Sequence, residues 1–126
     1  MRFWIVVIVF IIIISLFTYF SNIMILPTIE KMNNYIDKII ADVENDRFEN
    51  AKVECKEMIK YWNTRKKVWA TLIDHQEIDN IESNLTRILK ITTYKDKSDI
   101  IGEASQLKFY VIHIKERIIL SFENIF

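Results

Sequence analysis

The clearest pattern in the chain is a run of apolar positions, three and four residues apart, that extends from Phe48 to Leu72. Its members are Phe48, Ala51, Cys55, Met58, Trp62, Arg65, Trp69 and Leu72. Apart from Arg65, each is apolar or small. This spacing places them on one face of an α-helix. We therefore expect a long amphipathic helix whose apolar seam packs against other helices.

Three further segments after Pro27 repeat this spacing. Their apolar positions are Ile29, Met32, Ile36, Ile39 and Val43, then Ile78, Ile81, Leu85, Ile88 and Thr92, then Ile100, Ala104, Leu107, Val111, Ile114 and Ile118. Short polar stretches at 44–47, 74–76 and 94–98 separate the segments. Asn45 or Asp46 can cap the helix that begins near Phe48, and Asp74 can cap the next helix.

The seams also match one another in register. Short turns make neighbouring helices antiparallel, so the numbers of facing residues should have a constant sum. Met58 with Thr92 and Leu72 with Ile78 meet this condition across the second turn, and Ile88 with Ala104 meets it across the third. Ile36 and Cys55 meet it across the first turn to within one residue. The expected fold is all-α: an N-terminal transmembrane helix followed by an antiparallel helical bundle of about four helices.

The N-terminal run is the strongest local signal. Residues 3–20 carry no charge and only Ser15 and Thr18 as weakly polar positions. At a rise of about 1.5 Å per residue, this run is long enough to cross a bilayer core of about 30 Å. Trp4 and Tyr19 lie near its ends, where interfacial aromatic residues occur. The run therefore predicts a membrane-spanning helix.

A cleaved signal peptide is the competing interpretation of this run. Its cleavage site would need small residues, whereas Tyr19 and Phe20 are bulky. We therefore expect an uncleaved transmembrane signal anchor over residues 1–26 and a bundle domain over residues 27–126. A short tail with Arg2 before the span, followed by a long charged domain, favours a single-pass cell-membrane protein whose N-terminus is cytoplasmic and whose bundle is extracytoplasmic.

The helix after Pro27 is too short to cover the whole seam of residues 48–72. Counting the register backwards brings Ile25, Asn22 and Thr18 opposite Arg65, Trp69 and Leu72. We therefore expect the end of the membrane helix to project and pack there, which would place the bundle directly on the bilayer. The residues expected near the interface are Trp69, Phe122, Ile125 and Phe126. Pro27 should kink this helix because its ring clashes with the carbonyl of Ile23.

Composition narrows the function classes. The chain has 17 basic and 17 acidic residues, and no basic stripe predicts nucleic-acid binding. A single Gly and a single Pro leave no room for glycine-rich loops that cradle phosphates, and we expect no cofactor. Cys55 is the only cysteine, so no intrachain disulfide can form. Because Cys55 lies on the seam, we expect a small buried apolar side chain.

The candidates for chemistry are polar residues at the membrane-facing end of the predicted bundle. The register places Asp79 opposite His113 and Glu82 within reach of Arg65. A metal site there would use His75, His113 and Asp79, or Glu116, since imidazoles and a carboxylate suit zinc. No HExxH or CxxC motif supports this set. We favour a His–Asp pair and an Arg–Glu pair that fix helix register, with a pH response as a further alternative.

Trp62 and Trp69 could stack a ligand, but aromatic residues at seam spacing are usually core residues, and we favour that interpretation. The two tryptophans also belong to a set of residues that carries a family resemblance.

This set consists of Trp62, Trp69, the stretch Leu72-Ile73-Asp74-His75-Gln76-Glu77-Ile78-Asp79-Asn80-Ile81, Leu107-Lys108, His113-Ile114 and Glu123-Asn124-Ile125. In these residues the chain is similar to the uncharacterised family called domain of unknown function 4363. This resemblance implies a small helical protein with an N-terminal membrane segment, from Gram-positive and largely clostridial bacteria. It implies no activity.

The favoured function is interaction, as a scaffold, adaptor or accessory subunit of another envelope protein. The alternative is an extracytoplasmic sensor or binding domain that uses His75, Asp79 and His113 for a metal ion or protons. We do not expect an enzyme, because no nucleophile–base arrangement, catalytic metal motif or cofactor loop is recognisable. The expected partners are the lipid bilayer and an envelope protein or a second copy of the chain, and not a nucleic acid.

Overall fold

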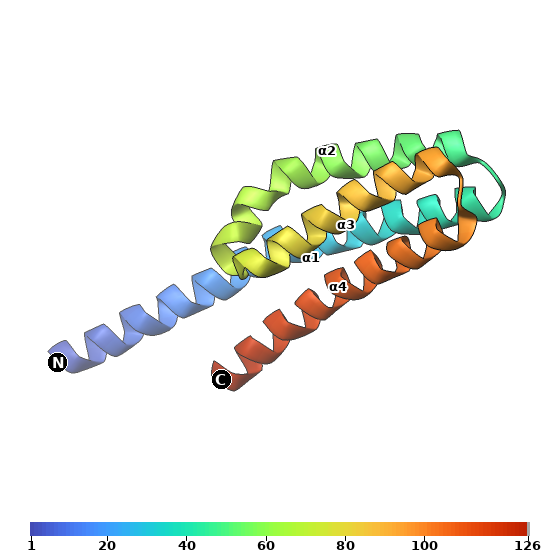
Figure 1. Cartoon of the computed structure of the whole chain (residues 1–126). Helices are drawn as coiled ribbons and strands as arrows, with labels where there is room; N and C mark the ends of the chain where they lie inside the picture. Colours follow the sequence, from blue (N-terminus) through green and yellow to red (C-terminus); the bar gives the residue numbers. More distant parts are fainter. Residues whose placement is uncertain (126) are drawn as a thin grey trace.

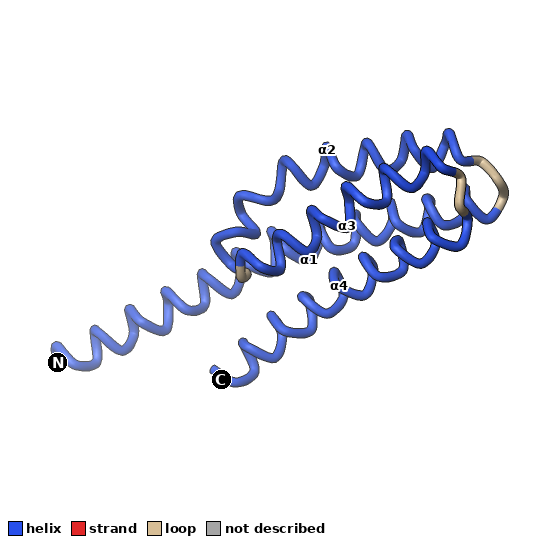
Figure 2. Tube along the Cα trace, viewed as in Figure 1, coloured by secondary structure: helices blue, strands red, loops and turns tan. Residues whose placement is uncertain are grey.

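Four helices make up the chain in a computed structural model, which describes the backbone of residues 1–125 and the side chains of residues 1–118. They are α1 (Arg2–Glu44), α2 (Phe48–Leu72), α3 (His75–Tyr94) and α4 (Lys97–Ile125). Figure 2 shows that the connections between them are short loops and that the described backbone contains no strand. The predicted all-α fold and the three predicted turns are confirmed.

The helices form an up-and-down bundle in which each helix packs against two others. Helix α1 packs against α2 and α4, and α3 also packs against α2 and α4, so α1 and α3 lie diagonally opposite each other. Because consecutive helices reverse direction, the pairing of α1 with α4 is antiparallel too and closes the bundle. In Figure 1 the N-terminal half of α1 extends away from the other helices.

The predicted seams form the core. The buried apolar side chains are Ile25, Ile29, Met32, Ile36, Ile39 and Val43 of α1, Ala51, Cys55, Met58, Trp62 and Trp69 of α2, Ile78, Ile81, Leu85 and Ile88 of α3, and Ile100, Ala104, Leu107, Val111 and Ile114 of α4. Full burial of a large apolar side chain stabilises a fold by about 1.5–3 kcal/mol. This one cluster therefore provides the main driving force for joining the four helices.

Arg65 is the one residue of the predicted α2 seam whose side chain lies at the surface and not against the core. Its side chain is exposed, and its guanidinium lies 5.5 Å from the ring centroid of Tyr61 on the outside of α2. Burying a guanidinium without a paired carboxylate is costly, whereas the face of an aromatic ring at the surface leaves the charge hydrated. The core seam of α2 therefore passes directly from Trp62 to Trp69.

Helix α1 is continuous through Pro27, so the apolar N-terminal run and the first bundle helix are one element. Proline cannot donate to the carbonyl four residues earlier. Next to it, Thr28 Oγ1 donates to the carbonyl of Met24 at 2.9 Å, which adds a local bond at this point. The kink expected at Pro27 stays a prediction.

The C-terminal end of the apolar run packs into the bundle, as expected. Ile25 and Ser21 are buried at the same end as Trp69, which is fully buried. The register was wrong by one residue for Asn22, which is exposed, because α1 continues its buried face from Ile25 by a step of four to Ser21. Thr18 is half-buried. Of the residues expected at the interface, Phe122, Ile125 and Phe126 lie outside the side chains that the structure describes.

The turn between α1 and α2 differs from the expected capping pattern. The N-cap residue of α2 is Arg47, whose side chain makes no capping hydrogen bond. Asn45 instead turns back to α1, where its Nδ2 donates to the carbonyl of Ala41 at 2.8 Å. Asp46 adopts a left-handed conformation with φ of 61°, which reverses the chain without a helix cap. The predicted cap at Asn45 or Asp46 is therefore wrong.

Aspartates cap the two later helices. Asp74 is the N-cap of α3, and its carboxylate accepts a hydrogen bond from the backbone N–H of Gln76 at 3.5 Å, as predicted. Before α4, Asp96 accepts from the backbone N–H of Asp99 at 3.1 Å. Such bonds satisfy N–H groups that lack a partner in the first turn of a helix.

Candidate functional site

The structure does not bring the predicted histidine–aspartate cluster together. His75, Asp79 and His113 are all exposed. The His113 ring stacks on Phe109 of its own helix, with centroids 5.8 Å apart. The ion pair that joins α3 to α4 at this level connects Glu77 to Arg117, so the predicted Asp79–His113 pair is wrong.

Helix geometry explains this error. A constant sum of residue numbers gives the height at which two residues lie along antiparallel helices, but not their angle around each axis. Successive residues are separated by about 100° around a helix. Ile78 faces the core, Glu77 turns toward α4, and Asp79 turns to the outside. Within the residues that the structure describes, no group of three or more His, Cys, Asp or Glu side chains could hold a metal ion.

The predicted Arg65–Glu82 pair fails for the same reason. Glu82 lies 3.2 Å from Nζ of Lys66, the next residue along α2. It also accepts a hydrogen bond from Nε1 of Trp62 at 3.4 Å. The carboxylate therefore joins α3 to α2 at the predicted height, but through different partners.

The two tryptophans are core residues. Trp62 and Trp69 are buried, and their rings meet edge to face with centroids 5.3 Å apart and planes at 74°. Their faces are covered by the bundle, so neither ring is free to stack a ligand. The sequence-based preference for a core role is confirmed.

Cys55 is also a core residue. Its side chain is fully buried, and burial raises the pKa of the thiol to about 12. The thiol therefore stays protonated near neutral pH, and a protonated thiol is a poor nucleophile. The expectation of a small buried apolar side chain holds.

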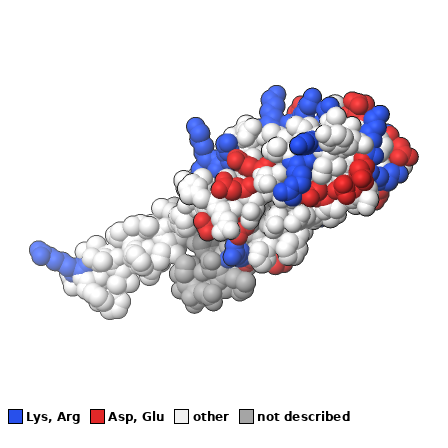
Figure 3. Space-filling model, in the orientation of Figure 1, with Lys and Arg blue, Asp and Glu red and all other residues white. Residues whose placement is uncertain are grey.

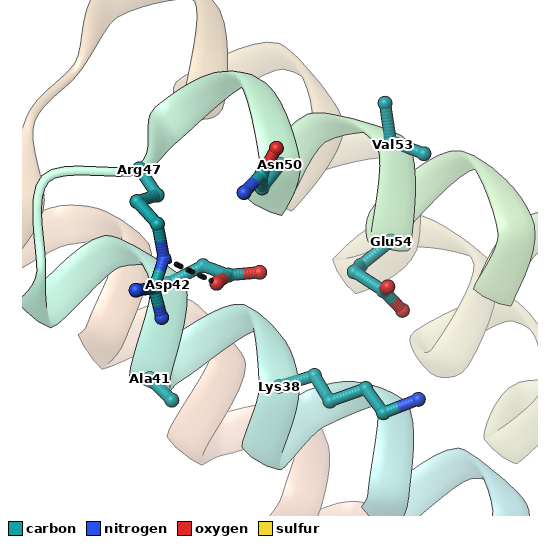
Figure 4. Close-up of a pocket in the computed structure, with 7 residues that line it drawn as sticks. All are labelled: Lys38, Ala41, Asp42, Arg47, Asn50, Val53 and Glu54. Carbon is teal, nitrogen blue, oxygen red and sulfur yellow. Dashed lines mark hydrogen bonds and ion pairs between the residues drawn. The ribbon is translucent and has the colours of Figure 1, made fainter.

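A shallow hollow lies between α1 and α2, beside the loop that joins them (Figure 4). It has a volume of about 450 Å³ and is lined by Lys38, Ala41, Asp42, Arg47, Asn50, Val53 and Glu54. Arg47 Nε and Asp42 Oδ1 form an ion pair of 2.9 Å at one end. Figure 4 shows Lys38 and Glu54 at the other end. The hollow offers both signs of charge to a polar group but no activated nucleophile.

The sequence pattern contained no signal for this hollow. Of its charged residues, Lys38 and Arg47 are exposed and Asp42 and Glu54 are half-buried, and no spacing in the sequence links them. The hollow arises where the chain turns from α1 into α2, and it lies at the end of the bundle opposite the apolar half of α1.

Charges of both signs are mixed over the bundle surface in Figure 3, and several join neighbouring helices. Lys108 pairs with Asp37 at 2.7 Å and joins α4 to α1. Arg87 pairs with Glu103 at 3.2 Å and joins α3 to α4. These exposed pairs help to select helix neighbours, and each contributes about 0.2–1 kcal/mol at most.

The N-terminal half of α1 has a contrasting surface. Its large side chains from Phe3 to Phe20 are mostly exposed, and apart from Arg2 the face seen in Figure 3 carries no charge there. Helix α1 is long and apolar enough to cross a membrane, and no residue of its most apolar 18-residue window is buried.

These features define a small antiparallel four-helix protein with an N-terminal helix that has the length and composition of a membrane span. The chain belongs to the family described as Domain of unknown function (DUF4363), whose model matches residues 19–125. The match therefore covers the whole bundle. A search of curated proteins found no match, and a search of solved structures found none either.

Proposed function

We propose that this protein is a membrane-anchored interaction protein, whose extracytoplasmic bundle acts as a scaffold or accessory subunit for another protein of the cell envelope. The observation that carries this proposal is the continuity of α1. One helix provides both the exposed apolar run and a buried face of the bundle core. The bundle is therefore held at the bilayer surface without a flexible linker.

The exposed apolar run supports anchoring. Soluble proteins rarely expose a continuous apolar surface as large as the one formed by residues 3–20. A bilayer would cover these side chains, and all backbone groups of a helix are satisfied within it. Arg2 before the run favours a cytoplasmic N-terminus, and the bundle is then extracytoplasmic.

The positions of the polar side chains support binding over catalysis. His75, Asp79 and His113 point outward from separate places, and several of the carboxylates, such as Glu77 and Glu82, form ion pairs between helices. Cys55 is buried and protonated. A scaffold needs a stable shape and accessible surfaces, and this distribution of side chains fits that requirement.

The test is crosslinking of the full-length protein in its native membrane, followed by affinity recovery and mass spectrometry. The matched control is Ile81→Asp, which keeps α1 but disrupts the core because Ile81 is fully buried. Recovery of one envelope protein in near-equal amount, and its loss with Ile81→Asp, would support the accessory-subunit role. Recovery of the protein alone would overturn that role.

Topology is tested separately with an alkaline phosphatase fusion after Phe126. An active fusion is expected if the bundle is extracytoplasmic. An inactive fusion, together with an active cytoplasmic reporter at the same position, would refute the proposed orientation.

A further inference from the structure

The outward face of α4 carries a line of two small and two apolar residues that no other helix covers. Gly102, Ser105, Phe109 and Ile112 are spaced by three and four residues and lie on the exposed side of α4, away from the buried seam of Ala104, Leu107 and Val111. Such spacing places the four residues in one line along the helix. Phe109 is 63% exposed and Ile112 is 37% exposed. We call these four residues the outer seam of α4.

The outer seam differs from the other exposed apolar positions of the bundle. Beyond α1, the described large hydrophobic side chains that are exposed are Val53, Tyr94, Phe109 and Ile112. Val53 and Tyr94 lie on different helices, whereas Phe109 and Ile112 are neighbours on one face. A contiguous apolar surface with a polar surround is typical of an interaction site, whereas scattered single residues are not.

The shape of the outer seam suits a helix. A Cβ added to Gly102 would meet no atom within 4 Å, and Ser105 is small, so another backbone can approach closely there. Phe109 and Ile112 form a raised apolar pair one turn further on. The Phe109 ring is stacked on His113 with an angle of 9° between the planes, which restricts its motion. A flat region next to a raised one matches the ridges and grooves of a second helix.

The height of the outer seam argues against lipid as its occupant. The Lys108–Asp37 ion pair of 2.7 Å places Phe109 near the level of Asp37 on α1. The apolar run of α1 ends at Leu26. At about 1.5 Å per residue, Asp37 lies roughly 16 Å beyond that end, whereas the polar layer of a bilayer adds only about 5–7 Å on each side. The occupant is therefore a protein.

Charge argues against a second copy of this chain. Two copies anchored in one membrane would be related by a two-fold axis along the membrane normal, which sets equivalent residues of a shared seam against each other. Glu116 continues the line of the outer seam, is exposed, and forms no ion pair with any described side chain. Two Glu116 carboxylates would then meet, and like charges in contact at an interface are unfavourable.

We propose that the outer seam of α4 binds an extracytoplasmic amphipathic helix of a different membrane protein. That helix places apolar residues on Phe109 and Ile112 and a basic residue opposite Glu116. This inference rests on the proposed scaffold function, because it names the surface and the kind of partner. The hot spots of such an interface are expected to be the two large apolar side chains, at the centre of the contact.

The first experiment places a photo-crosslinking amino acid at Ser105 of the full-length protein in living cells. The matched control places the same residue at Lys60, on the outward face of α2. The expected result is an adduct at Ser105 with a different membrane protein, at a predicted helix that carries an apolar seam and a basic residue. Adducts with a second copy of the chain would overturn the proposal.

A second experiment compares Phe109→Gln and Ile112→Gln with Val53→Gln and Tyr94→Gln. Loss of a hot spot should reduce adduct formation at Ser105 about tenfold or more for the first two variants, and leave it unchanged for the controls. Thermal unfolding of each variant verifies that the bundle is folded. Equal adduct yields for all four variants would overturn the proposal.

The two positions also separate this proposal from the proposed function. An adduct with another protein at Lys60 but not at Ser105 would reject the outer seam and leave the scaffold role standing. No protein adduct at either position, together with recovery of the protein alone in the membrane crosslinking test, would reject both.

Discussion

Trp62 and Trp69 meet edge to face in the core, 5.3 Å apart, but only one of their indole N–H groups has a partner. Trp62 Nε1 donates to Glu82, whereas Trp69 Nε1 is buried and forms no hydrogen bond within the described residues. A buried polar group without a partner is destabilising. The two rings therefore bury similar apolar area, but the buried N–H of Trp62 is hydrogen-bonded, whereas that of Trp69 lowers the stability of the fold.

This difference can be measured with Trp62→Phe and Trp69→Phe. Both variants lose similar ring volume, so the cavity cost largely cancels in their comparison. Trp62→Phe also loses a hydrogen bond to a carboxylate, and we expect it to destabilise the fold by about 1 kcal/mol more than Trp69→Phe. Chemical denaturation of the detergent-solubilised protein measures both. A larger loss for Trp69→Phe would contradict the unpartnered N–H.

The second prediction concerns Cys55. The unfolded thiol titrates near 9.0 and the buried thiol at about 12. The unfolded state therefore loses its proton first, so this group lowers the free energy of unfolding as pH rises from about 9 to about 12. Its full contribution is present below about pH 9. The slope reaches at most about 1.4 kcal/mol per pH unit.

The measurement compares the wild type with Cys55→Ala between pH 8 and pH 11. The variant lacks the titrating thiol, so its stability should fall less steeply above about pH 9. In addition, a thiol reagent should label Cys55 slowly in the folded protein and rapidly in denaturant. Rapid labelling of the folded protein at pH 8 would refute the buried, protonated thiol.

The third prediction concerns the cap of α3. Asp74→Ala removes the carboxylate that accepts from Gln76 N–H and should cost about 0.5–1 kcal/mol, since the bond is long at 3.5 Å. Asp74→Ser keeps an oxygen at the same place and should retain most of the stability. Thermal unfolding monitored by circular dichroism compares the two. Equal loss for both variants would show that the side-chain oxygen of Asp74 does not stabilise α3.

The fourth prediction concerns Pro27, which lies inside α1. Pro27→Ala restores an N–H that can donate to the carbonyl of Ile23 and removes the steric clash of the ring. It should stabilise the bundle in detergent by about 1–3 kcal/mol, the order of the cost of proline in a helix interior. Unfolding of Thr28→Ala, which keeps Pro27, serves as the comparison. Lower stability of Pro27→Ala would indicate that the native packing requires the proline.

Most of the fold could be predicted because one physical signal dominates it. Buried residues recur with the helical period, so the seams at Ile36, Cys55, Leu85 and Leu107 were found directly from their spacing. The short polar stretches between them left only antiparallel packing. The continuity of α1 through Pro27 was harder to predict from the sequence, because a proline there is compatible with a break, a kink or an unbroken helix.

The polar contacts were predicted less well, and the errors share a cause. Lys66 replaces Arg65 as the partner of Glu82, and Glu77 takes the place of Asp79 in joining α3 to α4. The predicted residue and the actual one differ by one or two positions, at nearly the same height but at a different angle around the helix. Side-chain length and the exact helix rotation decide such contacts, and apolar spacing alone does not specify them.

Because α1 is unbroken, a change in the tilt of its membrane-spanning part would move the whole bundle. With the proposed anchoring, about 18 residues between Leu26 and Glu44 extend the span away from the bilayer, a length of roughly 27 Å at 1.5 Å per residue. A change of 10° in the tilt of the span would move the far end of the bundle by about 5 Å along the membrane surface, since no flexible joint absorbs the rotation. Bilayer thickness, which sets helix tilt, would therefore change the position of everything that the bundle holds.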